Sequence, residues 1–598
     1  MNNCNDLAVI NEWSNTSFSD MQKVPYGISN FEMLVSNNYF YIDRTPYLEL
    51  LENMSYRYLF FLRPRKFGKS LFLSLLEYYY DLDKKDKFES LFGQFYIGQQ
   101  PTPMANQYLI LQFDFSQIDT SSFENTFQGF LNNVKIGAAR FFGRYSQFFS
   151  EEDEKKIDQY DFPAQVIQYV LERVEKKVSK HKIYLLIDEY DHFANEILSF
   201  RYDEFMTMVG KNGFVRKFYE AIKVGTQQGW IDRLFVTGVS PITLDSLTSG
   251  FNIATNVSLN LRLDKMLGFT EAEVITILKS VGVAAKDLDH VLADLRDWYN
   301  GYQFNEESKT KVYNSNMVLY FAANYAEFKQ YPRELLDPNI ASDYNKIRKS
   351  FKIQGREKEH LIHLETLVKT GKISAKLTRL YDLGKRFDDD DFISLLFYQG
   401  IITITGLTIG KVAFQIPNYV IKQLYFQYFH QVILERSQLT QLKRQVDNDV
   451  EALAINGDLV PLVEYTEKVL QELAVRDTIR FDEKYLKAIF TAAIFNSGIY
   501  TIRNEFEVKV PVKAGHTGKG FVDLLLLARQ PYQPNFQAVI EFKYLKKKDA
   551  KQAESVKQAA IEQLENYLQQ DDFLSKLDKL KAFVVVFVGY KGELVELR

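Results

Sequence analysis

The sequence has little that would allow covalent cross-linking or insertion into a membrane. Its single cysteine, Cys4, excludes an intramolecular disulfide framework and a cysteine-rich zinc site, and a reducing compartment is what we expect. No uninterrupted apolar run reaches the roughly 18 residues that a membrane-spanning helix needs. The amino-terminal segment also lacks the basic and then apolar pattern of a secretory signal. We therefore expect a soluble, cytoplasmic protein that does not engage a membrane.

An excess of positive charge is also missing. The net charge is −4 over 598 residues, so any contact with nucleic acid must come from a local basic patch. Apolar residues make up 46% of the chain and charged residues 25%, which are values of a globular protein. A chain of this length is too long for one hydrophobic core, and it suggests about three or four domains.

A strand, a loop and a helix follow one another at residues 56–80. Residues 58–62 form a wholly apolar run of strand length, and residues 71–80 are apolar nearly all round, as in a buried helix. The loop between them ends in Gly68, Lys69 and Ser70. Consecutive backbone N–H groups in such a loop, with the positive end of the following helix, form a concave anion site. Gly68 allows the backbone to approach a phosphate, Lys69 can reach the β and γ oxygens, and Ser70 can hold Mg²⁺.

The segments around this loop alternate between strand and helix. Before it, we predict a helix at 31–34, a strand at 39–42 and a helix that begins at Thr45 as N-cap and ends near residue 54. After it, we predict strands at 108–115, 183–187 and 234–239, with helices at 163–179 and 213–226. Strands that alternate with helices imply right-handed crossovers and a parallel sheet. The fold class is therefore α/β, with a parallel-sheet, P-loop nucleotide-binding domain.

Two consecutive carboxylates follow the strand at 183–187. Asp188 and Glu189 would lie at its carboxyl end, where ligands bind in open α/β sheets. Asp188 would hold Mg²⁺, and Glu189 would polarise the water that attacks the γ-phosphate. A strand that ends in an ordinary polar turn is the alternative, and Lys69 upstream favours the site. Thr237 and Ser240, at the end of the strand at 234–239, offer hydroxyls that could contact the γ-phosphate, although such residues are also common in turns.

Beyond residue 260 the pattern becomes helical. Thr270 and Glu273 have the spacing of a capping box before an apolar helix, which could form a lid over the nucleotide. We interpret the aromatic turn at 298–302 as packing. Residues 340–475 are mostly charged amphipathic helix, with a β-rich interruption at 400–414. A structural role and a DNA-clamping role both stay open for this region.

The carboxy-terminal segment predicts a small α/β unit with its own acidic site. Strands are expected at 505–511, 521–527, 536–543 and 582–588, and a helix at 549–569. Glu541 and Lys543 point the same way, because side chains alternate along a strand, and Asp523 lies on the strand before them. Two carboxylates can bind Mg²⁺, and the lysine can orient or activate water for attack on a phosphodiester. A surface ion pair on a structural strand is the alternative.

Two further features accompany that site. Six lysines from Lys543 to Lys557 form a local basic stretch suited to phosphates, although charge runs are more often merely solvated. Gln563 and Tyr567 lie one helical turn apart and could brace the site.

Seven stretches carry a resemblance to a known family. They are, in chain order, YFYIDRT, RPRKFGKSLFLSLL, LLIDEYD, FVTGVSPI, GFTEAEV, WYNGYQF and FVDLLLL with VIEFKY. Together they resemble the prokaryotic family that joins an AAA-like (ASCE-type) ATPase domain to a carboxy-terminal PD-(D/E)XK domain of restriction-endonuclease-like fold. In that family the phosphate loop also begins with Arg where the usual motif has Gly, which implies that Arg63 belongs to the nucleotide site.

Two functions are compatible with these motifs. The first is an ATPase with a Mg²⁺-dependent, or Mn²⁺-dependent, nuclease that cleaves DNA or RNA under the control of ATP. The second is an ATP-driven switch or scaffold whose nuclease-like domain binds nucleic acid or protein without cleaving it. Retention of Asp523, Glu541 and Lys543 together favours the first. Either protein could form a homo-oligomer.

The expected domain organisation has four parts. They are a polar amino-terminal extension at 1–24, the ATPase domain at 25–265, a mainly helical lid and connecting region at 266–475, and the nuclease-like domain at 476–598.

Overall fold

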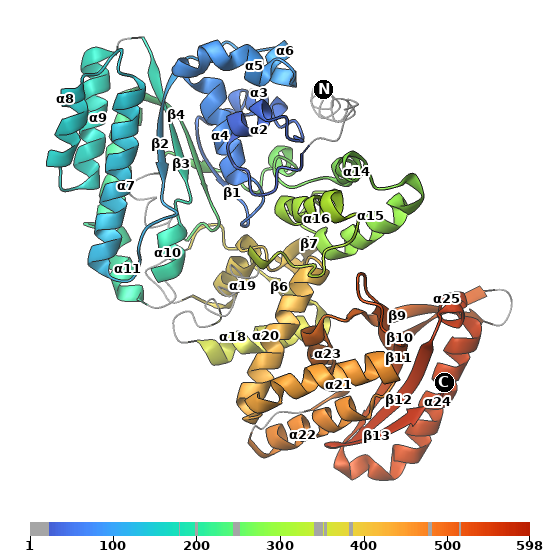
Figure 1. The fold of residues 1–598 in the computed structure, drawn as a ribbon. Coiled ribbons are helices and arrows are strands. Elements are labelled where there is room, and N and C mark those ends of the chain that lie inside the picture. Colours follow the sequence, from blue (N-terminus) through green and yellow to red (C-terminus); the bar gives the residue numbers. More distant parts are fainter. Residues whose placement is uncertain are drawn as a thin grey trace. The chain divides into compact units, whose positions relative to one another are not determined.

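The computed structural model describes residues 23–178, 180–197, 201–242, 252–339, 351, 356–381, 387–476, 481–512 and 516–598. The predicted amino-terminal extension therefore lies almost entirely outside the described residues. The chain divides into two compact units (Figure 1). The first unit comprises Met1–Lys329, Leu336–His360 and Lys372–Asn418. The second unit comprises Gln330–Leu335, Leu361–Gly371 and Tyr419–Arg598.

The first unit is built on a five-stranded parallel sheet with the strand order β2-β3-β4-β1-β5. The strands are β1 (Tyr58–Leu62), β2 (Tyr108–Asp114), β3 (Lys182–Asp188), β4 (Ile231–Gly238) and β5 (Thr255–Asn256). Each neighbouring pair runs parallel, with Leu62 beside Gly238 and Asp114 beside Asp188 in the register. The carboxyl ends of β1, β3 and β4 therefore meet at one edge, as the sequence predicted.

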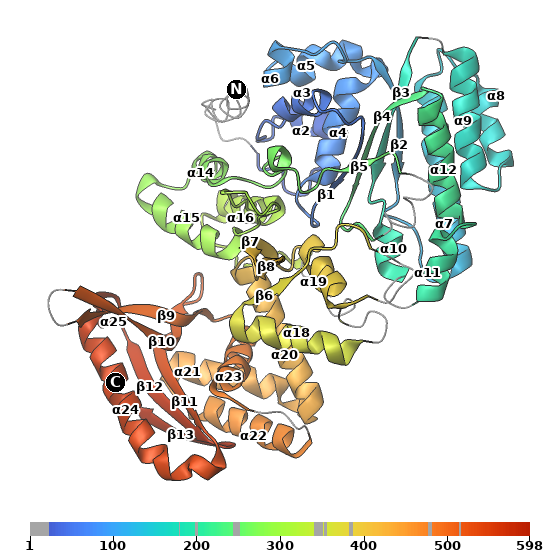
Figure 2. The ribbon, with the colours of Figure 1, turned by 180° about the vertical axis from the view of Figure 1, so that it is seen from behind.

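Helices cover both faces of this sheet. Helices α7 (Phe123–Arg144), α9 (Pro163–Lys177) and α12 (Phe214–Gln227) lie on one face, and α4 (Lys69–Tyr80) lies on the other (Figures 1 and 2). Strands buried on both sides need continuous apolar runs, and β3 is buried at every position after Lys182. The apolar runs in the sequence are explained by this double cover.

Shorter elements complete the periphery of the sheet domain. They are α2 (Phe31–Ser36), α3 (Pro46–Glu52), η1 (Leu82–Lys87), α5 (Phe88–Phe92), α6 (Tyr96–Gln99), α8 (Glu151–Lys155), η2 (Lys156–Gln159), α10 (His192–Ile197), α11 (Tyr202–Val209) and η3 (Leu261–Leu263).

The strand predicted at 39–42 is wrong. Tyr39 makes one isolated bridge with Lys23, and residues 40–42 belong to no strand. The apolar side chains of this segment serve packing instead, since the Tyr41 ring lies 5.5 Å from that of Phe31 on α2. Thr45 precedes α3 as predicted, but its hydroxyl accepts a hydrogen bond from the Ile97 N–H rather than capping the helix.

The rest of the first unit is largely helical and carries a small antiparallel sheet. Its elements are α14 (Glu271–Ser280), α15 (Ala285–Tyr299), α16 (Ser315–Phe328), β6 (Lys372–Ala375), α19 (Asp389–Tyr398), β7 (Thr403–Thr408) and β8 (Lys411–Gln415). The capping box at the start of α14 is confirmed, because the Thr270 and Glu273 side chains each accept the other's backbone N–H. The predicted β-rich interruption is confirmed as β7 and β8, and the aromatic turn is buried packing.

The second unit holds a mixed five-stranded sheet with the order β13-β12-β11-β10-β9. Its strands are β9 (Tyr500–Val512), β10 (His516–Ala528), β11 (Gln537–Leu545), β12 (Leu580–Val588) and β13 (Lys591–Glu596). Among the described strands of this sheet, only β11 and β12 pair in parallel, and helix α24 (Ala553–Gln570) lies between them in the chain. Strand β13 was not predicted, because its polar edge sequence shows little of the apolar signal of a buried strand.

Helices flank this sheet on both sides. Helix α24 covers one face, and α22 (Val460–Arg476) and α23 (Glu483–Ser497) lie toward the other (Figures 1 and 2). The remaining elements are α18 (Glu357–Thr370), which spans the division between the units, α20 (Tyr419–Ser437), η5 (Thr440–Leu442), α21 (Lys443–Asn456), η6 (Lys547–Gln552) and α25 (Asp572–Lys576). Within the described ranges, no helix is both long and apolar enough to cross a membrane.

Candidate active sites

The phosphate loop connects β1 to α4 in a conformation that exposes its backbone. Lys66 and Gly68 both have positive φ, at 67° and 96°, and Gly68 is the residue that caps α4. A Cβ added at Gly68 would meet no atom within 4 Å, so the space beside this backbone is open. The glycine thus tolerates the left-handed geometry and leaves room for a ligand to approach.

The carbonyl groups of the same loop face a neighbouring helix. The Asn316 N–H donates to the Lys66 carbonyl (3.2 Å), and the Ser315 hydroxyl donates to the Phe67 carbonyl (3.2 Å). Phe67 itself is buried and packs edge-on against Tyr302, with 5.0 Å between the ring centroids. The loop is therefore held from behind by α16 and by the aromatic turn.

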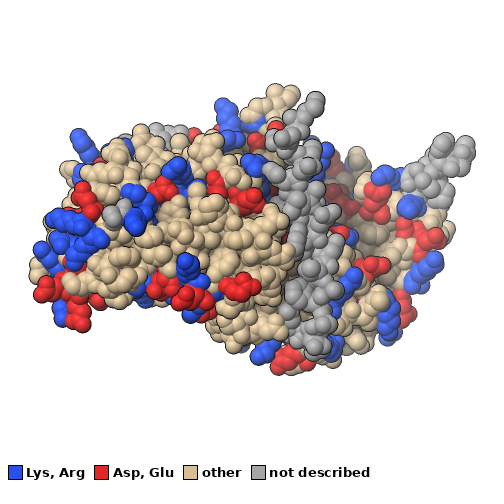
Figure 3. All heavy atoms as spheres, turned by 90° about the horizontal axis from the view of Figure 1, so that it is seen from above, with Lys and Arg blue, Asp and Glu red and all other residues tan. Residues whose placement is uncertain are grey.

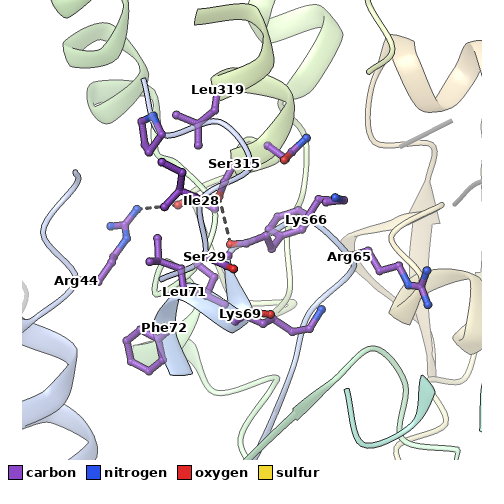
Figure 4. Close-up of a pocket in the computed structure, with 18 of the residues that line it drawn as sticks. Ile28, Ser29, Arg44, Arg65, Lys66, Lys69, Leu71, Phe72, Ser315 and Leu319 are labelled. Carbon is purple, nitrogen blue, oxygen red and sulfur yellow. Dashed lines mark hydrogen bonds between the residues drawn. The ribbon is translucent and has the colours of Figure 1, made fainter. Parts of the chain in front are cut away.

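A cavity of about 450 Å³ opens in front of the loop. Its polar wall is formed by Arg65, Lys66, Gly68, Lys69, Ser70, Asp114, Asp188, Glu189 and His192. Its apolar wall includes Ile28, Phe40, Leu71, Phe72, Leu267 and Leu319. Figure 4 shows Arg65, Lys66 and Lys69 projecting from the loop, with Ser315 and Leu319 on the helix beside it. A cavity of this size and mixed lining is suited to a small charged ligand with an apolar part.

Lys69 lies buried at the base of this cavity. Its ammonium donates to the carbonyl oxygens of Arg63 (3.1 Å) and Pro64 (3.3 Å) and lies 3.7 Å from Glu189 Oε1. The charge is thus held beside the loop, where the oxygens of a phosphate would arrive.

Asp188 is the last residue of β3 and lies beside Ser70, the second residue of α4. Its Oδ1 accepts hydrogen bonds from the Thr237 hydroxyl and from the Glu189 N–H. Burial, followed by the neighbouring Glu189 charge, raises the pKa of Asp188, and a hydrogen bond with Ser70 opposes that rise. The Ser70 and Asp188 oxygens are therefore close enough to share one divalent cation.

Glu189 occupies an unusual backbone conformation for its residue type. Its φ is 49°, in the left-handed region that non-glycine residues rarely adopt. Such strain is concentrated at functional sites, and here it directs the carboxylate toward Lys69.

The structure places the Arg63 side chain in the core rather than in the cavity. Its guanidinium donates to the carbonyl oxygens of Leu62, Ser258 and Leu263. It also lies between two aromatic rings, 4.3 Å from the Phe61 centroid and 4.1 Å from that of Phe304. The predicted contact of this side chain with the nucleotide is corrected accordingly, because core groups enclose the guanidinium.

Ser240 is likewise buried and is not among the residues that line the cavity. Its N–H and hydroxyl both donate to Asp191 Oδ2, at 2.7 and 3.0 Å. Asp191 therefore anchors the end of β4, and the predicted γ-phosphate contact of Ser240 is not part of this conformation.

Sequence reasoning missed two groups at this edge of the sheet. Asp114 pairs with Asp188 in the strand register and lines the cavity, and its place at the end of a predicted strand was a usable signal. Arg65 lies 3.0 Å from His192 Nδ1, and nothing in the sequence links these two distant positions.

The carboxy-terminal strands bring the second predicted site together. Asp523 on β10 accepts the Phe542 N–H through Oδ2 (2.7 Å), so it lies beside the middle of β11. Lys543 donates to Glu541 Oε1 (2.7 Å), as expected for two side chains on one face of a strand. All three predicted residues are therefore adjacent.

Glu541 is the most deeply buried of these groups. Its side chain is 2% exposed, and its Oε2 atom has no hydrogen-bond partner among the described residues. Burial, together with the negative charge of Asp523, raises the pKa of Glu541 to about 7 despite the nearby Lys543. A buried carboxylate oxygen that lacks a donor fits a divalent cation, which prefers hard oxygen ligands. No cluster of three or more His, Cys, Asp or Glu suited to a metal occurs in the described part of the chain, so water or substrate would complete such a site.

Lys487 is a member of this site that sequence reasoning missed. It projects from α23, and its ammonium lies 2.6 Å from Asp523 Oδ1 and 3.5 Å from Glu483 Oε1. The spacing of Glu483 and Lys487 indicated a helical ion pair, but the contact with Asp523 depends on long-range packing. Gln563 and Tyr567 hydrogen-bond each other on α24, and the Tyr567 ring packs against Gly520, so they support β10 rather than the carboxylates.

Two family models match this chain. Residues 25–248 match the model of a predicted AAA-ATPase, and residues 481–596 match that of the PD-(D/E)XK nuclease superfamily. The chain joins an AAA-ATPase-like domain to a PD-(D/E)XK nuclease superfamily domain. The AAA-ATPase-like match contains the phosphate loop, Asp188 and Glu189. The nuclease superfamily match contains Lys487, Asp523 and Glu541.

Two individual proteins are also similar. An uncharacterized protein in the vnfD 5′ region of Azotobacter chroococcum mcd 1 is 26% identical over 336 residues, which are 55% of this chain and 57% of that protein. The chain thus spans little more than half the length of this relative. A Walker-type ATPase of Pyrococcus abyssi matches 68% of this chain and 99% of its own, with a TM-score of 0.37 and 10% identity.

Proposed function

We propose that the AAA-ATPase-like domain binds and hydrolyses ATP, and that the nuclease superfamily domain cleaves DNA or RNA with Mg²⁺ under the control of that ATP. The observation that carries the first half is the convergence of Lys69, Ser70, Asp188 and Glu189 on one cavity. The observation that carries the second half is the buried, unpartnered Glu541 oxygen beside Asp523.

In the nucleotide site, the loop N–H groups and Lys69 bind the β- and γ-phosphates. Ser70 and Asp188 would hold Mg²⁺, which would supply positive charge to offset that of the phosphates. Glu189 orients the attacking water and accepts its proton. The apolar wall that includes Ile28, Phe72 and Leu319 receives the base.

In the nuclease site, Asp523 and the Glu541 Oε2 atom would hold Mg²⁺ or Mn²⁺, which would supply Lewis-acid activation of water. Lys543 orients that water or stabilises the negative charge that develops on the phosphodiester. Glu541 must be ionised for this role, and the contact with Lys543 favours its charged form against the effect of burial, which raises its pKa to about 7.

A nucleic-acid partner would contact a local basic surface. Lys546, Lys548 and Lys551 are exposed beside β11, whereas Lys557 is neutralised by Glu554 and Glu593. On the face of the molecule drawn in Figure 3, the described basic and acidic side chains are interspersed around uncharged areas.

The proposal assigns the ATPase to 25–265, the connecting region to 266–475 and the nuclease domain to 476–598, which the matches at 25–248 and 481–596 support. It also places the protein in the cytoplasm, since one cysteine is typical of a reducing compartment. The protein could also form a homo-oligomer, and the roles proposed for the site residues would stay the same.

A second candidate is an ATP-driven switch or scaffold whose nuclease superfamily domain binds nucleic acid or protein without cleaving it. The pairing of each site carboxylate with a lysine favours this alternative, because two lysines already balance the two acidic charges.

One experiment separates the two candidates. Purified full-length protein would be incubated with labelled DNA and RNA, with and without ATP and with Mg²⁺ or Mn²⁺. Cleavage that is lost in Asp523→Ala supports the nuclease. ATP turnover that depends on Lys69, without cleavage of any substrate, supports the scaffold. Absence of Lys69-dependent ATP binding contradicts both.

A further inference from the structure

A lysine that is not among the proposed catalytic residues forms an ion pair with one of the site carboxylates. The Lys487 ammonium lies 2.6 Å from Asp523 Oδ1, and the other Asp523 oxygen accepts the Phe542 N–H at 2.7 Å. The side chains of Lys487 and Asp523 are only 17% and 12% exposed, so water screens this ion pair weakly. Both oxygens of Asp523 are therefore engaged.

The two carboxylates of the site are not equivalent. Lys543 engages only Oε1 of Glu541, and Oε2 has no partner among the described residues. Glu541 can thus accept a cation without losing an existing contact. Asp523 Oδ1 can do so only if the ammonium moves, because an ammonium and a divalent cation at the same oxygen repel each other.

Packing fixes the helix that carries this ammonium. Phe490, one turn after Lys487 on α23, contacts the Phe542 ring edge-on, with 5.0 Å between the centroids. The helix is therefore locked against β11, and only the flexible side chain of Lys487 is left to move. Glu483 Oε1 lies 3.5 Å from the same ammonium and offers an alternative acceptor on the same helix.

We propose that Lys487 is a displaceable counter-ion of the cation site. It neutralises Asp523 when no divalent cation is bound, and it shifts toward Glu483 when a cation binds between Asp523 and Glu541. Lys487 is then a positioning residue that acts through Asp523 and sets the concentration of cation at which the site fills. This inference rests on the proposed function, since it requires Asp523 and Glu541 to be the cation ligands.

Calorimetric titration of the full-length protein with Mn²⁺ alone tests this role without any measurement of cleavage. Lys487→Met removes the competing charge, and we expect Mn²⁺ to bind about tenfold more tightly or better. Lys487→Arg keeps the charge and should keep the affinity of the unaltered protein. Lys484→Met removes one charge from an exposed position on the same helix and is the matched control.

The heat of Mn²⁺ binding at this site is the part of the total titration heat that is absent in the Asp523→Asn variant. Affinity in Lys487→Met that does not exceed that of Lys484→Met overturns the inference while leaving the proposed metal site intact. Absence of Asp523-dependent Mn²⁺ binding in every variant contradicts the proposed metal site itself. If Lys487→Met does not fold, Lys487→Gln takes its place, and a larger rise of the thermal midpoint with Mn²⁺ than in the unaltered protein is the expected result.

Discussion

The Lys69 ammonium and the Glu189 Oε1 atom lie 3.7 Å apart in the cavity beside the phosphate loop. This contact joins the residue proposed to bind phosphate to the residue proposed to activate water. A γ-phosphate would compete with Glu189 for the ammonium, because both are anionic. Its arrival would release the carboxylate to contact the attacking water, so binding and activation would be linked through one lysine.

Replacing Lys69 with alanine should weaken ATP binding by at least ~1.5–3 kcal/mol, the scale of a hydrogen bond to a charged group. The main positive charge beside the phosphates is lost in this variant. Calorimetry with ATP and Mg²⁺ provides the measurement, and Lys85→Ala on the exposed 3-10 helix η1 is the control. Unchanged affinity in Lys69→Ala would show that the nucleotide binds elsewhere.

Glu189→Gln should retain ATP affinity and lose turnover by about 10²–10⁴-fold, the range of general base catalysis. Glutamine preserves the size of the side chain but cannot accept the proton of the attacking water. Single-turnover hydrolysis measured beside equilibrium binding separates these two effects. Hydrolysis at the original rate would mean that another group is the base.

Arg63→Met should lower the thermal midpoint of the AAA-ATPase-like domain, with a loss of stability of about 1–3 kcal/mol, the cost of leaving a buried acceptor without its donor. Three carbonyl oxygens lose their donor, and the space between Phe61 and Phe304 loses its guanidinium. Scanning calorimetry measures the change. A variant with an unaltered midpoint but reduced ATP affinity would return Arg63 to the nucleotide site.

Asp523→Ala should abolish nucleic-acid cleavage and leave ATP hydrolysis largely intact, since the two sites lie in separate units. Lys543→Ala should still bind Mn²⁺ but lose turnover to a similar extent, because the ammonium acts on water or on developing charge. Parallel assays of nuclease and ATPase activity measure both effects. Undiminished cleavage by Asp523→Ala is the contradicting result.

The pH dependence of stability should report on Glu541. Its pKa is raised to about 7 in the folded protein, above the usual 4.5 of the unfolded chain. The folded state therefore binds this proton more tightly, which stabilises the protein below the unfolded pKa and is lost as the pH rises through about 7. Without divalent cations, the thermal midpoint of the second unit should fall between about pH 5 and 8. Glu541→Gln should flatten that fall, and an equally steep curve in this variant would assign the titration to another group.

The sequence was sufficient for features that depend on local pattern. The apolar run before Asp188 marked a strand that ends in a carboxylate at the sheet edge, and the structure places Asp188 there. The edge position predicted for Asp523 is wrong, because Asp523 lies in the middle of β10, between β11 and β9. Features that depend on long-range packing were not accessible. The direction of Arg63 is set by carbonyl groups almost two hundred positions away, and the contact of Lys487 with Asp523 requires α23 to pack on β11. The aromatic residues at 39–42 give the sequence pattern of a strand, because packing against α2 favours the same side chains.

The attachment of the phosphate loop to α16 has a consequence for the energetics of ligand capture. The Lys66 and Phe67 carbonyls are engaged by Asn316 and Ser315, and within a planar peptide group the N–H points opposite to the carbonyl. The amides that follow these carbonyls are thereby turned away from α16 before any anion arrives. The entropy of ordering the loop is lost when the domain folds rather than when the ligand binds, so the site is preorganised. Loosening the loop by Ser315→Ala would therefore slow anion capture without altering the loop N–H groups or Lys69.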